Sequence, residues 1–460
     1  MTTSTIPERA RAVLLAVQMP DVDDAAFASS LGELGRLAKT LGLDVVGQVT
    51  QKRGRLATGT VVGEGKLAEL ARWTGGTGVV PVGPPTPRRR ADREREDDDD
   101  GASEAQADAS AVAQADAPAQ RATVVLVDHD VTPTQTRNLE RATGAEVLDR
   151  TAVILAIFQR HARSREARLQ VEIARLNYLA PRLRETGGGK DRQGGGIGGR
   201  GAGESSIELD RRKLRDRVAE LRAELASIER ESGTRRKRRA QQSTVALVGY
   251  TNAGKSSWMR VLTGSGVLVQ DKLFATLDTT VRALQPETVP RILVSDTVGF
   301  IKKLPHDLVA SFRSTLDEAR DCDLLLHVVD ASDPAFPAQI EVTRAVLAEI
   351  GATEAPRLLV LNKADRVDAD ARARLAADWP DAIQVSAKDP ADVARLRERI
   401  LSFFERDMVE AELLVPYAKQ KLVGEAHGSC RVLAETHDEH GTRLKLRARP
   451  EVIERLRAAL

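Results

Sequence analysis

The feature that most restricts the fold of this chain is an eight-residue run that matches the phosphate-binding loop pattern G-x-x-x-x-G-K-[ST]. Its members are Gly249, Tyr250, Thr251, Asn252, Ala253, Gly254, Lys255 and Ser256. An apolar run precedes it and a helical pattern follows it, which is the context that the motif requires. Glycines let backbone N–H groups wrap phosphates, and the N-terminus of the following helix adds partial positive charge. We therefore expect Lys255 to reach the β- and γ-phosphates of a nucleotide and Ser256 to bind Mg²⁺.

Apolar runs and helical patterns alternate along residues 241–406. Strands are expected at 245–248, 292–295, 324–329, 358–361 and 383–385. This alternation is typical of a doubly wound α/β domain, in which helices cover both faces of a mainly parallel sheet. The phosphate-binding loop then begins where the first of these strands ends.

A second motif follows the strand expected at 292–295. Asp296, Thr297, Val298 and Gly299 match D-x-x-G, the pattern of a magnesium-side Asp and a Gly that senses the γ-phosphate. The pattern alone recurs by chance in proteins of this length. Its position at the end of the next apolar strand after the phosphate loop makes it a strong indication.

The motif after the strand at 358–361 points to guanine. Asn362, Lys363, Ala364 and Asp365 match N-K-x-D. The Asp365 carboxylate can accept two hydrogen bonds from the N1–H and the exocyclic amine of guanine, which adenine cannot supply. The base pocket is completed by Ser386, Ala387 and Lys388 after the strand at 383–385. Together the motifs predict a site for GTP.

A switch loop is expected between the phosphate loop and D-x-x-G. Its candidate members are Phe274, Ala275, Thr276, Leu277 and Asp278. Thr276 is the first choice for the second hydroxyl on Mg²⁺, with Thr279 and Thr280 as alternatives. Phe300 follows the glycine of D-x-x-G, where some GTPases place a water-orienting Gln. We therefore expect slow intrinsic hydrolysis of GTP, with activation by a partner.

Residues 1–160 predict a smaller α/β domain. Strands are expected at 13–17, 45–49, 60–62, 123–127 and 146–148, and helices at 26–41, 66–72 and 134–142. Residues 81–122 interrupt it with prolines, a mixed charge run and an Ala/Asp/Gln/Ser tract that holds almost no large apolar side chain. Such a segment cannot bury enough surface to offset its ordering entropy, so a disordered insertion is predicted.

Two heptad-spaced segments at 161–240 predict an antiparallel helical hairpin. Leu169, Ile173, Leu176, Ala180 and Leu183 share the spacing of Leu214, Val218, Leu221, Leu225 and Ile228. The tip at 186–203 holds ten glycines in eighteen positions. Residues 161–240 carry 21 Lys and Arg against 12 Asp and Glu, so the hairpin has a net charge of +9 in a chain of +2. A flexible linker is one interpretation of the glycine-rich tip, although a linker needs no heptad-matched arms to project it.

Residues 407–460 predict a small α+β domain. A strand is expected at 413–415, a helix at 419–425, a β-hairpin at 431–449 and a closing helix at 451–460. His437 and His440 lie at the expected turn, where a solvated polar loop is a better interpretation than a metal site.

The remaining composition limits the class of protein. Cys322 and Cys430 form no C-x-x-C pair, so a disulfide framework or structural zinc site is excluded and a reducing compartment fits. The first ten residues lack the pattern of a signal peptide, and no stretch approaches the ~18 apolar residues of a membrane helix. A cytoplasmic protein without a membrane span is expected, and weak association with a membrane is left open.

The combination resembles the HflX-type GTPases of the Obg–HflX group. The resemblance is carried by the runs GYTNAGKSS, LFATLD, DTVGFI, NKAD and SAK, by LDRTAVIL at 148–155 and by GGIGGRGAGES at 195–205. It covers nearly the whole chain except 81–122. Two departures are Ser257-Trp258, where the family commonly has Thr-Leu, and residues 203–206 at the hairpin tip. Trp258 is expected to be a core residue.

The resemblance implies a GTPase that binds the large ribosomal subunit and splits or rescues stalled ribosomes under stress. Its implied partners are rRNA, ribosomal proteins and GTP or GDP, with a monomer away from the ribosome. Related GTPases with Asn at the position of Asn252 use it to help hold K⁺ between the phosphates. Lys255 and Asn252 are thus the candidate catalytic residues, with Mg²⁺ and K⁺ as candidate cofactors. The alternative is that Asn252 only caps the loop.

A second function remains open on this sequence. The chain could be a GTP-dependent regulatory switch whose hairpin binds a protein and no RNA. An ATP-dependent kinase or helicase is disfavoured by NKAD. Docking on rRNA phosphates predicts steep salt sensitivity, whereas a coiled-coil contact with a protein does not.

Overall fold

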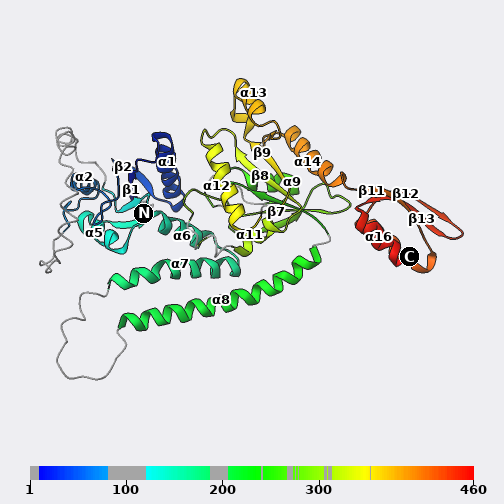
Figure 1. Cartoon of the computed structure of the whole chain (residues 1–460), viewed down its shortest axis with the longest axis horizontal. Coiled ribbons are helices and arrows are strands. Elements are labelled where there is room, and N and C mark those ends of the chain that lie inside the picture. The colour runs from blue at the N-terminus through cyan, green and yellow to red at the C-terminus, as the bar shows by residue number, and fades with distance from the viewer. Residues whose placement is uncertain are drawn as a thin grey trace, which may run out of the picture. The chain divides into compact units, whose positions relative to one another are not determined.

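A computed structural model describes residues 10–80, 121–186, 206–239, 242–266, 273–274, 276–277, 279–304, 308, 313–352 and 354–460 (Figure 1). Residues 81–120 of the predicted insertion, residues 187–203 of the predicted tip, Ala275 and Asp278 lie outside the described residues. The chain divides into two compact units, Met1–Arg160 with Arg175–Asp216 and His161–Ala174 with Arg217–Leu460.

The first unit is built on a four-stranded parallel sheet in the order β2-β1-β3-β4. The strands are β1 (Arg11–Gln18), β2 (Asp44–Lys52), β3 (Val124–Val127) and β4 (Glu146–Asp149). The helices are α1 (Asp24–Leu41), α2 (Glu64–Thr74), α5 (Pro133–Thr143) and α6 (Arg150–His161). The central strands β1 and β3 are buried along nearly their whole length, as expected for a parallel sheet covered on both faces.

Two sequence predictions in this unit are wrong. The strand predicted at 60–62 is a turn, because Val61 has a φ of 71° and exchanges two backbone hydrogen bonds of 3.0 Å with Ala57. The apolar side chains of Val61 and Val62 serve to fill the core. The insertion also ends earlier than predicted, since Ala122 is buried and its N–H donates to the carbonyl of Trp73 at 2.8 Å.

Helices α7 (Arg165–Thr186) and α8 (Ser206–Arg239) form the predicted antiparallel pair (Figure 1). Arg165 pairs with Glu224 at 2.7 Å, and Glu172 pairs with Arg217 at 3.3 Å. Moving seven residues along α7 thus moves seven residues back along α8. These ion pairs are exposed and contribute little to stability.

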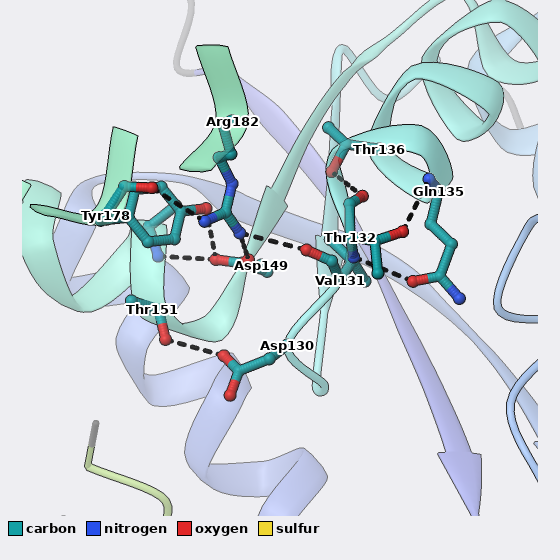
Figure 2. A network of polar contacts seen from close by, with 10 residues as sticks. Asp130, Val131, Thr132, Gln135, Thr136, Asp149, Thr151, Tyr178 and Arg182 are labelled. Carbon is teal, nitrogen blue, oxygen red and sulfur yellow. Dashed lines mark hydrogen bonds and ion pairs between the residues drawn. The ribbon is translucent and has the colours of Figure 1, made fainter. Parts of the chain in front are cut away.

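The end of α7 is fastened to the carboxyl edge of the first sheet (Figure 2). Asp149, buried at the end of β4, accepts hydrogen bonds from Arg182 Nη2 at 2.6 Å and from the Tyr178 hydroxyl at 2.8 Å. Arg182 also donates to the carbonyl of Val131 at 3.1 Å, and its guanidinium lies 3.5 Å from the centre of the Tyr178 ring. Burial raises the pKa of Asp149, while the charge of Arg182 lowers it. Residues far apart in sequence therefore fix the second half of α7 on this unit.

The second unit contains a six-stranded sheet in the order β10-β9-β8-β5-β7-β6. Its strands are β5 (Ser243–Val248), β6 (Thr280–Ala283), β7 (Ile292–Asp296), β8 (Leu324–Asp330), β9 (Arg357–Asn362) and β10 (Ile383–Gln384). Only β6 runs antiparallel to its neighbour among these described strands. The helices are α9 (Lys255–Thr263), α11 (Arg313–Arg320), α12 (Phe336–Glu349), α13 (Ala369–Asp378) and α14 (Pro390–Glu405). The predicted doubly wound α/β fold is confirmed.

The chain ends in a three-stranded antiparallel sheet, β11-β13-β12, with two helices. These elements are β11 (Val409–Val415), α15 (Lys421–Ser429), β12 (Arg431–Asp438), β13 (Gly441–Ala448) and α16 (Pro450–Ala459). The turn between β12 and β13 contains His440, as predicted, whereas His437, which was also expected at the turn, lies in β12. Within the described ranges there is no group of three or more His, Cys, Asp and Glu side chains that could hold a metal ion. In the same ranges no helix combines the length and the apolar character needed to cross a membrane.

Candidate functional site

The phosphate-binding loop links β5 to α9, and two of its glycines are required by close approaches. A Cβ on Gly249 would lie 2.1 Å from the carbonyl oxygen of Val328, and a Cβ on Gly254 would lie 2.2 Å from Nδ2 of Asn362. Both glycines also have φ values, 144° and 102°, that L side chains rarely adopt. The glycines of the motif therefore let the loop pack against the ends of β8 and β9.

Lys255 is the buried cation of the loop. Its Nζ donates to the carbonyl oxygens of Gly249 at 3.0 Å and of Tyr250 at 2.9 Å. Burial lowers the pKa of Lys255 to about 8, and the nearby Asp296 carboxylate opposes that shift. Burial likewise raises the pKa of Asp296 against the charge of Lys255. The two buried side chains therefore influence each other's charge beside the phosphate-binding loop.

Three oxygens meet beside this pair. Thr276 Oγ1 lies 2.7 Å from Ser256 Oγ and 3.1 Å from Asp296 Oδ2, and Ser256 Oγ lies 2.8 Å from the same carboxylate oxygen. The second oxygen of Asp296 is buried without a hydrogen-bond partner among the described residues. Two hydroxyls and a carboxylate are hard oxygen donors of the kind that Mg²⁺ prefers. The residues present therefore fit a magnesium ion.

Thr276 is held beside Ser256 and Asp296 by its buried neighbours in the switch segment. Phe274 and Leu277 are buried on either side of it and anchor the switch segment in the protein. Phe274 has a φ of 57°. Thr280, one of the two alternatives to Thr276, is the first residue of β6.

Asn362 connects the base-binding end of the site to the phosphate loop. Its Nδ2 donates to the carbonyl of Ala253 at 2.7 Å, and its Oδ1 accepts the N–H of Ala387 at 3.4 Å. The side chain is buried. One amide therefore holds three of the predicted motifs together.

Asp365 is the polar end of the predicted base pocket. Its Oδ1 accepts the Ser386 hydroxyl at 2.7 Å, and its Oδ2 lies 3.5 Å from the Lys388 ammonium. The hydrogen bond from Ser386, followed by the charge of Lys388, lowers the pKa of Asp365. The carboxylate is consequently ionised at neutral pH and accepts hydrogen bonds on both oxygens.

Sequence reasoning missed Asp330, the last residue of β8. Its carboxylate pairs with the Lys363 ammonium at 2.6 Å and accepts the Ser332 hydroxyl at 2.6 Å. This half-buried ion pair holds the side chain of Lys363, which lies between Asn362 and Asp365 in the sequence. The available signal was a carboxylate at the carboxyl end of a buried strand, the edge of an α/β sheet where ligands bind.

Other predicted residues fall into two groups. Thr297, Val298 and Ala364 are buried, and Thr297 Oγ1 donates to the carbonyl of Leu247 at 2.8 Å, so these residues support the site from behind. Asn252 is exposed in the phosphate loop with a φ of 61°. Trp258 is fully buried in the core, as predicted.

Thr251 carries a buried hydroxyl that the rest of the site does not use. Its Oγ1 has no hydrogen-bond partner among the described residues. Buried hydroxyls in folded proteins nearly always have a partner. A bound nucleotide or its water is therefore the expected partner.

Three family profiles match the chain. The family described as GTP-binding GTPase N-terminal matches residues 28–81 and 102–159, GTP-binding GTPase Middle Region matches 161–239, and 50S ribosome-binding GTPase matches 244–363. The GTPase HflX of Gluconacetobacter diazotrophicus is 60% identical over 456 residues, which cover 99% of each chain. The chain belongs to the HflX family of GTPases. The expectation of a GTPase, made above from the motifs, is confirmed by this membership.

Another member of the HflX family aligns over less of the sequence. The GTPase HflX of Escherichia coli is 41% identical over 338 residues, covering 72% of this chain and 79% of that protein. Among solved structures, a GTP-binding protein from the hyperthermophilic archaeon Sulfolobus solfataricus in complex with GDP is 23% identical, with a TM-score of 0.42. That comparison covers 85% of this chain and 98% of the solved one.

Proposed function

We propose that this GTPase binds the large ribosomal subunit through the basic hairpin. We further propose that it splits or rescues stalled ribosomes under stress. The observation that carries the proposal is the match of residues 244–363 to the family described as 50S ribosome-binding GTPase. The charge of the hairpin supports it independently. A protein that acts on ribosomes works in the cytoplasm, and we propose that it is a monomer away from them.

The proposed division of labour follows four segments of the chain. Residues 1–160 and 161–240 provide the α/β domain and the hairpin, residues 241–406 hydrolyse GTP, and residues 407–460 form the terminal α+β domain. We assign the nucleotide contacts to the four motifs and the switch segment. Asp365, Ser386 and Lys388 would read guanine, while Lys255 and the backbone N–H groups of the loop would hold the phosphates.

GTPases of this family generally use Mg²⁺, and Ser256 and Thr276 are the proposed ligands. When bound there, Mg²⁺ supplies positive charge to the phosphate oxygens. Lys255 contributes a further positive charge from a desolvated position, where it acts more strongly than it would in water. The protein thus stabilises the charge that develops during phosphoryl transfer mainly by electrostatics.

The residue that would position the attacking water in other GTPases is replaced in this site. Phe300, which takes the place of a water-orienting Gln, is 1% exposed and packs in the core. It cannot reach a water molecule from there. We therefore propose that the free protein hydrolyses GTP slowly and that the ribosome completes the site.

We also propose that K⁺ supplies charge between the phosphates, with Asn252 as one of its ligands. Asn252 is exposed at the loop that wraps the phosphates. The simpler explanation is that Asn tolerates the left-handed conformation found there. Rates of GTP hydrolysis in K⁺ and in Na⁺ at equal ionic strength, for the parent and Asn252→Ala, separate the two. A loss of K⁺ stimulation in the variant supports the ion, and equal rates of the parent in both salts refute it.

The hairpin provides the proposed contact with rRNA. Arg215 and Arg222 are exposed on α8, and residues 161–240 carry a net charge of +9. Neutralising rRNA phosphates releases counterions, so affinity should fall steeply as salt rises. A protein-binding switch without RNA contact, the alternative function, lacks this salt dependence.

Co-sedimentation with 50S subunits tests the proposal. In the presence of a non-hydrolysable GTP analogue, the parent should co-sediment, and Arg215→Glu/Arg222→Glu should not. Arg374→Glu/Arg399→Glu is the matched control, because it makes the same change of charge at exposed sites of α13 and α14. Equal sedimentation of both variants with the subunit, or no sedimentation of the parent, would contradict the proposal.

A further inference from the structure

The loop that follows D-x-x-G is tied to the phosphate-binding loop by a short backbone bridge. The N–H of Phe300 donates to the carbonyl of Gly249 at 3.2 Å, and the N–H of Thr251 donates to the carbonyl of Phe300 at 2.7 Å. The two hydrogen bonds form an isolated parallel β-bridge between Tyr250 and Phe300. The position of Phe300 is therefore set by the phosphate-binding loop itself.

The side chain of Tyr250 adds a third tie. It is 4% exposed, and its hydroxyl oxygen accepts the backbone N–H of Lys302 at 2.6 Å. This hydrogen bond lies two residues beyond the bridge, so it holds the chain on the far side of Phe300. Between these ties, Phe300 belongs to a buried hydrophobic cluster that also contains Val248, Leu316 and Leu325.

The same ties set the position of Gly299. A Cβ on Gly299 would lie 2.9 Å from Lys255 Nζ and 2.9 Å from Thr251 Cγ2. The backbone of Gly299, the glycine expected to sense the γ-phosphate, is thus held against Lys255, the lysine expected to bind the phosphates. If the chain beyond Phe300 came loose, both the glycine backbone and the Phe300 ring could move.

We propose that Tyr250 is a positioning residue for GTP hydrolysis. Its hydroxyl holds residues 299–302 on the phosphate-binding loop, which keeps the Gly299 backbone beside the phosphates and the Phe300 ring in the core. The phosphate-loop motif leaves this position free to vary, and the motif itself gives Tyr250 no role beyond its backbone. A hydroxyl that accepts a main-chain N–H acts here on the geometry of the transition state and leaves nucleotide binding intact.

Tyr250→Phe tests the proposal, because it removes only the hydroxyl and keeps the buried ring. The hydrogen bond from the Lys302 N–H is lost, so kcat for GTP hydrolysis should fall about two- to tenfold. KM for GTP and Kd for GDP should stay close to those of the parent. Amide hydrogen exchange of residues 299–304 should become faster, while that of β5 should not change.

Tyr417→Phe is the matched control. The hydroxyl of Tyr417 also bonds the main chain, at 2.8 Å from the carbonyl of Asp438, but it lies exposed in the terminal α+β domain. It should leave kcat unchanged. A kcat of Tyr250→Phe equal to or above that of the parent would overturn the proposal. A weaker Kd for GDP at unchanged kcat would also overturn it, because Tyr250 would then only support the loop.

Discussion

Replacing Asp365 by Asn should exchange the base preference of the site. The two oxygens of Asp365 are held by Ser386 and Lys388, and its lowered pKa keeps it ionised. Guanine offers two N–H groups to this carboxylate, and each charge-assisted hydrogen bond is worth about 1.5–3 kcal/mol. Both together correspond to roughly 10²–10⁴-fold in affinity. Because the Asp365 side chain is 35% exposed and Asn keeps one acceptor, we expect the lower part of that range.

Xanthine carries a carbonyl in place of the exocyclic amine of guanine, and that carbonyl can accept a hydrogen bond from the Asn amide. Titrations of Asp365→Asn with GTP and with xanthosine triphosphate should therefore show a loss for the first and a gain for the second. Asp370→Asn, the same change at an exposed position of α13, should bind GTP like the parent. Unchanged affinity of Asp365→Asn for GTP would remove Asp365 from the base pocket. So would the absence of any gain in affinity for xanthosine triphosphate at an unchanged melting temperature.

Three further predictions follow from buried groups. The buried Thr251 hydroxyl, which has no partner among the described residues, destabilises the nucleotide-free protein by about 1–3 kcal/mol. Thr251→Val removes this hydroxyl, so it should raise the Tm of the nucleotide-free protein and reduce the gain in Tm on adding GTP. Thr251→Ser should behave like the parent. Phosphates favour the charged form of Lys255, whose pKa in the free protein is about 8. The affinity for GDP, measured by calorimetry, should therefore be highest well below pH 8 and should fall by up to tenfold per pH unit above it. An affinity that does not change from pH 7 to pH 9 would contradict this. Deletion of 81–120 should leave the Tm unchanged, but deletion of 81–122 should lower it, because Ala122 is buried; equal melting of both deletions would show that Ala122 adds nothing.

Much of the nucleotide site could be predicted because its residues are local in sequence. Each motif occupies three to eight consecutive positions after an apolar strand, and parallel strands bring their carboxyl ends to one edge of a sheet. The meeting of Ser256, Thr276 and Asp296 follows from that arrangement. Asp330 also lies at the carboxyl end of a strand, but nothing in its own segment indicates that it pairs with Lys363, which follows β9.

Contacts between distant segments could not be read from the sequence. Tyr178 and Arg182 meet Asp149 across about thirty residues, and the Tyr250 hydroxyl meets the N–H of Lys302 across about fifty. No periodicity or motif encodes such a pair. The turn at Val61 was mistaken for a strand because its apolar run satisfies the core as well as a strand would.

We propose that the large ribosomal subunit positions the attacking water, because Phe300 stands where some GTPases place a water-orienting Gln. The most direct measurement is the rate of GTP hydrolysis by the purified protein as the concentration of 50S or 30S subunits is raised. We predict a low rate for the protein alone, a saturable increase with 50S subunits and no increase with 30S subunits. A rate that is already fast without ribosomes, or that responds equally to both subunits, would contradict it.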